Sequence, residues 1–182
     1  PAIDAAGEGD VITVEPGSYG EHIEFRGINI TLQSSDPCNP AIVATTRIQG
    51  VWYRQATIVT FTGTEGPTCK LSGFTITNGK GGIGCRFGSS PRLDHLVITG
   101  NTADETGRII ENGGGIMLWD NANPTITNTL IVDNYAINLG GAVWCGNSAP
   151  VFENVTIANN EAGYCGGIYC NNASPTIDNC II

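Results

Sequence analysis

Three segments of the chain repeat one pattern: a glycine pair, a short apolar run, a turn with proline, and a second short run. They read GGIMLWDNANPTITN at 114–128, GGAVWCGNSAPVFEN at 140–154 and GGIYCNNASPTIDN at 166–179. The aligned prolines, Pro124, Pro150 and Pro175, are 26 and 25 residues apart. Apolar residues alternate within each run, and no run of about ten residues has helical spacing. The repeat therefore predicts a solenoid of short strands and excludes leucine-rich, ankyrin and tetratricopeptide repeats.

Composition agrees with strands joined by tight turns and with a single core. The chain has 182 residues, of which 41% are hydrophobic, 14% are charged and 25 are glycine. A chain of this size builds one core, so we expect a single domain over 1–182. Within it we expect irregular coils over 1–80 and regular repeats over 81–182, with an insertion near 99–113 that emerges as a surface loop.

The charge of the chain limits its partners. The formal net charge is −9, with only eight lysines and arginines and no basic run. Nucleic acid is therefore not an expected partner, and an acidic polymer would be repelled unless a divalent cation intervened. No apolar stretch approaches the roughly 20 residues needed to span a bilayer, so no membrane span is expected.

Stacking the repeats as parallel coils places like residues in columns about 4.8 Å apart. Two inward columns are predicted, one of Ile83, Ile116, Ala142 and Ile168 and one of Ile76, Ile98, Ile131, Ile157 and Ile182. A turn column of Asn128, Asn154 and Asn179, with His95 in an earlier coil, is predicted to stack through its side-chain amides.

The repeated coils, the segment GFTITNG (73–79) and the opening AIDAAGEGDVITVEPGSYGEHIEF (2–25) resemble the secreted bacterial right-handed parallel β-helix proteins of the pectate-lyase-like superfamily. The resemblance covers nearly the whole chain. It implies an all-β right-handed parallel β-helix of about seven coils and an extracellular or cell-surface location. Members include lyases, hydrolases, epimerases and phage adhesins, so the resemblance is specific for fold and not for activity.

Family lyases bind calcium through clustered carboxylates and use Arg or Lys as the base, which directs attention to one group of charged residues. Arg86, Arg92, Asp94 and Asp120 lie on neighbouring coils near the turn from glycine to proline. Asp94 also shares an outward column with Glu153 and Asp178, interrupted by Thr127. We interpret both groups as surface charges, and we expect neither catalysis nor a metal or other cofactor.

Seven cysteines cannot all pair within one chain. Cys38 and Cys69 both lie in turn-like segments before strands and are the best candidates for a disulfide. Cys85 and Cys170 are expected in one inward column, too far apart to bond, with Leu118 and Trp144 between them. No CxxC or Cys/His spacing indicates a zinc site. Asn172, in the exposed sequon Asn-Ala-Ser, is the glycosylation candidate.

The two ends of the chain suggest a function. The C-terminal segment ends on Cys180, Ile181 and Ile182, which we expect to leave the last coil uncapped. The first coil of a second copy, with Val11, Ile12 and Val14, is expected to cover that coil and extend the strands. The leading hypothesis is a secreted, non-catalytic β-helix that stacks head to tail into a filament. The alternative is a fragment of a longer β-helix that binds or cleaves a polysaccharide. Besides a second copy of the chain, the possible partners are therefore a polysaccharide or an attached glycan.

Overall fold

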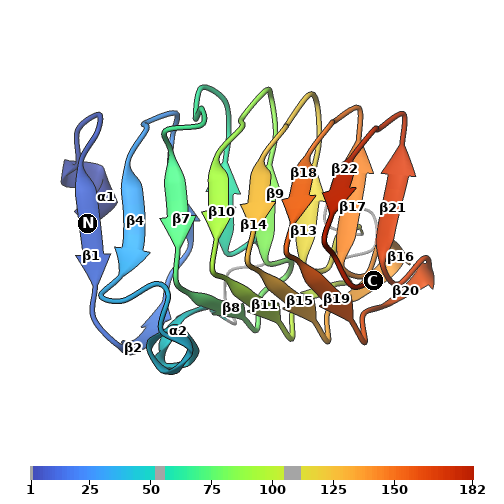
Figure 1. The fold of residues 1–182 in the computed structure, drawn as a ribbon, viewed down its shortest axis with the longest axis horizontal. Helices are drawn as coiled ribbons and strands as arrows, with labels where there is room; N and C mark the ends of the chain where they lie inside the picture. The colour runs from blue at the N-terminus through green and yellow to red at the C-terminus, as the bar shows by residue number, and fades with distance from the viewer. Residues whose placement is uncertain (1, 52–55, 105–111) are drawn as a thin grey trace.

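The described residues form a β-helix, in which the chain winds through the same series of strands once per coil (Figure 1). The computed structural model describes residues 2–51, 56–104 and 112–182. These residues contain two short helices and four parallel sheets, here named A to D. The insertion predicted near 99–113 falls partly on 105–111, which lie outside the described residues.

Sheet A runs the whole length of the solenoid, and its seven strands in the described residues confirm the predicted number of coils. In spatial order they are β1 (Val11–Val14), β4 (Thr31–Ser34), β7 (Lys70–Ser72), β10 (Arg92–Asp94), β14 (Thr125–Thr127), β18 (Val151–Glu153) and β22 (Thr176–Asp178). Sheet B follows sheet A in each coil and comprises β2 (Gly17–Gly20), β5 (Thr46–Gln49), β8 (Thr75–Thr77), β11 (Val97–Thr99), β15 (Leu130–Val132) and β19 (Thr156–Ala158).

Sheet C completes each coil before the chain turns back to sheet A. Its strands are β3 (Ile23–Glu24), β6 (Val59–Phe61), β9 (Ile83–Cys85), β13 (Ile116–Leu118), β17 (Val143–Gly146) and β21 (Ile168–Asn171). The short sheet D lies between sheets B and C in the later coils and consists of β12 (Thr102–Ala103), β16 (Tyr135–Leu139) and β20 (Glu161–Tyr164).

The core fills the space between the sheets with stacked aliphatic side chains. Ile98 pairs in register with Ile76 on one side and Ile131 on the other, and Ile131 pairs with Ile157. All four are buried, which confirms this predicted column. Because period-2 alternation sends every second side chain inward, residues such as Leu130 point to solvent from the same strand.

Two columns of asparagine stabilise the turns. The predicted column is confirmed: Asn154 donates to Asn128, Asn179 donates to Asn154, and all three residues have the left-handed backbone that Asn tolerates. A second column, which the repeat analysis missed, is inside the molecule. There Asn134 lies between Asn101 and Asn160, and its amide joins the side chains of both. These amides satisfy backbone groups that the tight turn would otherwise leave unpaired.

The inward column predicted through Ala142 is wrong by one residue. Ile116 pairs with Val143, and Val143 pairs with Ile168. Ala142 instead takes the place of a glycine in the flanking coils, since the amide of Ile116 bonds the carbonyl of Ala142. The glycine run is three residues long in one coil, Gly113 to Gly115, so a Gly-Gly pair can be aligned in two ways.

Two helices cover parts of the solenoid surface. Helix α1 (Ala2–Ala5) lies beside β1 at the N-terminal end (Figure 1), and its Ile3 and the following Ala6 pack against the core. Helix α2 (Pro40–Thr45) packs beside β5 and β8, with Asn39 as its N-cap. Neither helix in the described residues has the length and hydropathy to cross a membrane.

Candidate functional site

Asp94, on the outward face of sheet A, is the centre of the densest polar cluster near the predicted catalytic residues. Its Oδ2 lies 2.9 Å from Lys70 Nζ on the neighbouring strand, and its Oδ1 lies 2.8 Å from His95 Nδ1. Thr127 Oγ1 and Asn128 Nδ2, from the next coil, donate to the same Oδ1 at 2.8 and 3.0 Å. The side chain is only 14% exposed. The cluster therefore joins three successive coils through one carboxylate.

These contacts fix the charge state of Asp94. Burial by itself would raise the pKa of this carboxyl group, but donation from Lys70, Asn128 and Thr127 outweighs burial and holds the pKa well below its usual range. A carboxylate with so low a pKa is a poor proton acceptor at neutral pH. Since its oxygens are already bonded to neighbouring side chains, the geometry suits a structural link between coils better than a general base.

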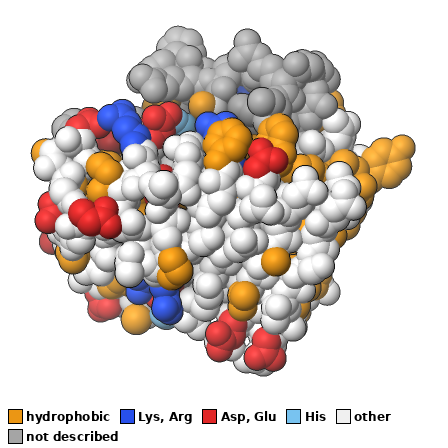
Figure 2. All heavy atoms as spheres, turned by 90° about the horizontal axis from the view of Figure 1, so that it is seen from above, with side chains coloured by type: hydrophobic (Ala, Val, Ile, Leu, Met, Phe, Trp, Pro, Cys, Tyr) orange, Lys and Arg blue, Asp and Glu red, His pale blue; other side chains and the backbone are white. Residues whose placement is uncertain are grey.

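The structure does not assemble the four predicted catalytic residues into one site. Arg92 is exposed on sheet A, one coil above Lys70, whereas Arg86 and Asp120 lie in the turns from sheet C to sheet A. Arg86 stacks over the Phe87 ring at 5.6 Å, and the Asp120 carbonyl accepts from the Gly88 amide. On the face formed by these turns, charged side chains are scattered (Figure 2).

The outward acidic column on sheet A is confirmed in register but does not form a metal site. Asp94, Thr127, Glu153 and Asp178 occupy one position in four successive strands. Thr127 interrupts the column, as predicted, and donates to Asp94. Within the described residues, no group of three or more Asp, Glu, His or Cys side chains is placed to hold a metal ion.

Sheet C carries an outward column of large side chains that sequence reasoning missed. Met117, Trp144 and Tyr169 occupy one position in three successive strands. Trp119, just beyond β13, meets Trp144 edge to face, with ring centroids 6.2 Å apart. Trp144 had been predicted to point inward, but the register of β17 places Cys145 inward and Trp144 outside. Trp119, Trp144 and Tyr169 are all partly exposed.

The aromatic column has an unused hydrogen-bond donor and little charge. In the part of the chain that the structure describes, the buried indole nitrogen of Trp144 has no hydrogen-bond partner. The residue next in register below Met117 is Gly84, so no side chain extends the column in that direction. The partly exposed side chains of Trp119, Trp144 and Tyr169 provide aromatic surface for a ligand that has apolar faces with hydroxyl groups at their edges.

The C-terminal coil leaves apolar side chains at the end of the solenoid. Ile177 and Ile182 continue inward columns, yet they are 45% and 62% exposed, whereas the residues beneath them, Phe152 and Ile157, are buried. Cys180 is partly buried and packs against the core, as its predicted position requires. Ile181 bridges Thr156, which places it in an outward column rather than at a core position.

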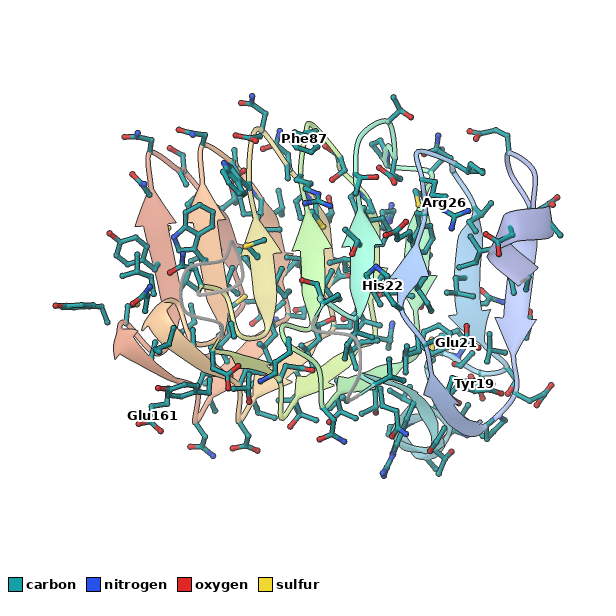
Figure 3. The ribbon with its side chains drawn as sticks, turned by 180° about the vertical axis from the view of Figure 1, so that it is seen from behind. Tyr19, Glu21, His22, Arg26, Phe87 and Glu161 are labelled. Carbon is teal, nitrogen blue, oxygen red and sulfur yellow. The ribbon has the colours of Figure 1, made fainter. Side chains whose placement is uncertain are left out.

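The N-terminal coil has an amphipathic cavity of about 390 Å³ rather than a simple apolar face. Ile12 and Val14 line its floor, but Val11 points away from the core, contrary to the prediction that all three would form a stacking surface. Tyr19, Glu21, His22 and Arg26, labelled in Figure 3, also line the cavity. His22 contacts Glu24 at 3.1 Å, and Arg26 contacts Asp4 on α1 at 2.8 Å.

The structure does not bring Cys38 and Cys69, the disulfide candidates, together, because they lie at opposite ends of the strands of sheet A. The amide of Lys70 bonds the carbonyl of Ile30, so Cys69 lies at the start of the strands of sheet A, while Cys38 follows the end of β4. Cys69 is buried, whereas Cys38 lines a groove of about 340 Å³ beside α2 together with His95. Asn172 is exposed in a left-handed turn, which is compatible with its predicted modification.

Comparison with known proteins agrees with the architecture. A family described as "Right handed beta helix region" matches residues 22–182. No curated protein matches the sequence. Among solved structures, a pectin methylesterase from Yersinia enterocolitica is similar, with a TM-score of 0.54 and 14% sequence identity over 83% of this chain. The match covers 53% of the enzyme, so this chain spans about half its length, and at this identity the likeness concerns the fold alone.

Proposed function

Because the chain belongs to the right-handed β-helix family, we propose that it is a non-catalytic extracellular protein that binds an extended, uncharged polysaccharide along sheet C. The observation that carries the proposal is the aromatic column of Trp144 and Tyr169, with Trp119 against its edge. Aromatic faces pack against the C–H faces of sugar rings, and a tyrosine also offers its hydroxyl group to theirs.

The spacing of the column supports a polymeric ligand. Residues in register on successive coils are about 4.8 Å apart, and the column runs along the solenoid axis. That repeat is of the order of the length of one sugar unit, so a chain lying along the axis would place successive rings over successive coils. A binding surface built on strands is also rigid, which reduces the entropy lost when the ligand is ordered.

The charge distribution favours an uncharged polymer. Met117, Trp144 and Tyr169 bring no charge to the column, and the net charge of the chain is −9. An acidic polysaccharide would be repelled at long range, whereas a neutral or esterified one would not. The low pKa of Asp94, which makes this carboxylate a poor general base, supports the non-catalytic part of the proposal.

Affinity electrophoresis through gels that contain a polysaccharide tests this proposal. Pectin, the polymer in the name of the structural neighbour, is a suitable first probe in its highly methyl-esterified form, together with neutral glucans. We expect retardation by an uncharged polymer, little dependence on salt, and no retardation by polygalacturonate.

Two variants separate binding by the column from adhesion elsewhere. Trp144→Ala combined with Tyr169→Ala should abolish the retardation while strand-type circular dichroism is kept. Tyr164→Ala, which removes a 74% exposed aromatic ring from sheet D, is the matched control and should leave retardation unchanged. A parent protein that no uncharged polymer retards, or a double variant retarded like the parent, would contradict the proposal.

A second candidate function is stacking on another copy, in which Ile177 and Ile182, exposed in this chain, would meet the second molecule. Covering these side chains with the first coil of a second molecule would complete two inward columns and pair the edges of the sheets. The other end is less suited to it, since α1 lies beside β1 there (Figure 1) and Asp4, Glu21 and Glu24 are among the residues that line the cavity. Head-to-tail stacking into an extracellular filament would therefore bring the last coil of one molecule against these carboxylates.

A further inference from the structure

Cys145 and Cys170 occupy one position on neighbouring strands of sheet C. Strand β17 pairs with β21 in register, and Cys145 is the direct partner of Cys170. The column below them continues through Leu118 to Cys85, so the two thiols are adjacent members of the inward column. Cys145 is buried, and Cys170 is exposed because it lies on the last coil of sheet C in this chain. The sequence alignment had placed Trp144, rather than Cys145, next to Cys170 in the inward column and so concealed the contact.

We propose that Cys145 and Cys170 form a disulfide that joins the last two coils of sheet C. In-register partners on parallel strands have Cα atoms about 4.8 Å apart, which is inside the range of about 4.4–6.8 Å that disulfides span. Both side chains leave the same face of the sheet, since paired residues on parallel strands share their orientation. The bond therefore requires rotation of the side chains without a change of register.

The other cysteines have poorer partners. Cys85 is separated from Cys145 by Leu118, a gap of two coils that exceeds the reach of a disulfide. The Cys165 thiol lies in a left-handed turn and contacts the Ile168 carbonyl at 3.2 Å, and the Cys180 thiol contacts the Asp178 carbonyl at 3.1 Å. In the described residues, only the Cys145–Cys170 pair is brought together by direct strand register.

The reaction needs an oxidant, for which a dissolved disulfide such as oxidised glutathione suffices. The Cys170 thiolate attacks one sulfur of glutathione disulfide, forms a mixed disulfide and releases one glutathione thiolate. The Cys145 thiolate then attacks Cys170 Sγ and releases the second glutathione thiolate. Two protein thiols become one disulfide, glutathione disulfide is reduced to two thiols, and these take up the two protons that the protein loses.

Burial sets the rate of this exchange. It raises the pKa of the Cys145 thiol to about 12 and also raises the pKa of Cys170. The thiolate is the nucleophile, so oxidation is expected to be slow near neutral pH and to accelerate between about pH 7 and about pH 9. Cys170, the accessible member, is the first to react.

The disulfide would also hold the two aromatic residues of the proposed binding surface. Trp144 and Tyr169 immediately precede the two cysteines and leave the opposite face of the same strands. A covalent link beneath them fixes the spacing of their rings. This consequence rests on the proposed function, whereas the disulfide itself is tested without any polysaccharide.

The experiment treats the purified chain with oxidised glutathione and maps its disulfides by mass spectrometry of unreduced peptides. We expect a Cys145–Cys170 cross-linked peptide and a rise in Tm of roughly 5–10 °C that a reductant reverses. Cys170→Ser and Cys145→Ala should each remove both the cross-link and the rise in Tm.

Cys165→Gly is the control, because glycine occupies the same left-handed turn position at Gly113 and Gly140. This variant should still form the cross-link and gain the same Tm. A Cys165–Cys170 peptide in place of the expected one, or stable mixed disulfides at Cys170 with Cys145 still a free thiol, would overturn the proposal. Circular dichroism of Cys145→Ala before oxidation shows whether the loss of cross-linking arises from misfolding.

Discussion

Lys70 on strand β7 and Asp94 on the neighbouring strand β10 are diagonal neighbours on sheet A, with Lys70 Nζ 2.9 Å from Asp94 Oδ2. Thr127 and Asn128 add donors from the following coil. The first prediction is that Asp94→Asn lowers the free energy of unfolding by about 1–3 kcal/mol, because hydrogen bonds to a partly buried charge are lost. Urea unfolding measures the change. Asp178→Asn, in the same column but exposed, should change it by less than about 0.5 kcal/mol, and equal effects would refute the structural role of Asp94.

Acid should weaken the protein through the same carboxylate. The pKa of Asp94 is lower in the folded chain than in the unfolded chain, where it is about 3.9. The stabilisation by Asp94 is therefore fully present above about pH 4 and is lost as pH falls through the folded pKa. Urea midpoints measured from about pH 6 down to about pH 2 should fall more steeply for the parent than for Asp94→Asn. Parallel curves would contradict the assignment.

The inward register of sheet B predicts opposite outcomes at two adjacent positions. Ile131→Asp puts a carboxylate into the core and should cost several kcal/mol, enough to prevent folding in a protein of ordinary stability. Leu130→Asp replaces an exposed side chain on the same strand and should cost less than about 1 kcal/mol. Thermal unfolding followed by circular dichroism compares the two, and similar Tm values would show that the register is wrong.

The internal asparagine column is expected to stabilise more than the external one. Asn134 donates to the carbonyls of Ile98 and Val132 and accepts from the Asn101 amide. Asn134→Ala leaves these buried groups unsatisfied and should cost about 2–4 kcal/mol in urea unfolding. Asn154→Gly, in the exposed column, keeps the left-handed turn and should cost less than about 1 kcal/mol. A reversed order would contradict this prediction.

Stacking between copies depends on the exposed coil face. If it occurs, Ile177→Lys combined with Ile182→Lys should remove long particles from negative-stain images and reduce the sedimentation coefficient at high concentration, because edge charges oppose strand pairing. Circular dichroism should be unchanged. A parent protein that sediments as a monomer at every concentration would leave the second candidate function without support.

The repeat and its period-2 alternation were sufficient to predict the parallel β-helix, the Ile98–Ile131–Ile157 column and the outer asparagine turns, since the segments from proline to asparagine align without gaps between coils. The errors came from register between coils. Aligning Gly-Gly pairs displaced Ala142 by one residue, which turned Trp144 inward and concealed both the aromatic column and the Cys145–Cys170 contact. Lys70 was missed as the partner of Asp94 because the first, irregular coils offer no repeat by which to align it.

Calorimetric titration with a size-defined, uncharged oligosaccharide tests the central claim most directly, once affinity electrophoresis has identified the polymer. Each aromatic ring of the column is expected to contribute about 1 kcal/mol, so the combined Trp144→Ala and Tyr169→Ala variant should bind at least roughly tenfold more weakly than the parent. Tyr164→Ala should bind like the parent. Equal dissociation constants for the parent and the double variant, with both proteins folded, would show that sheet C is not the binding surface.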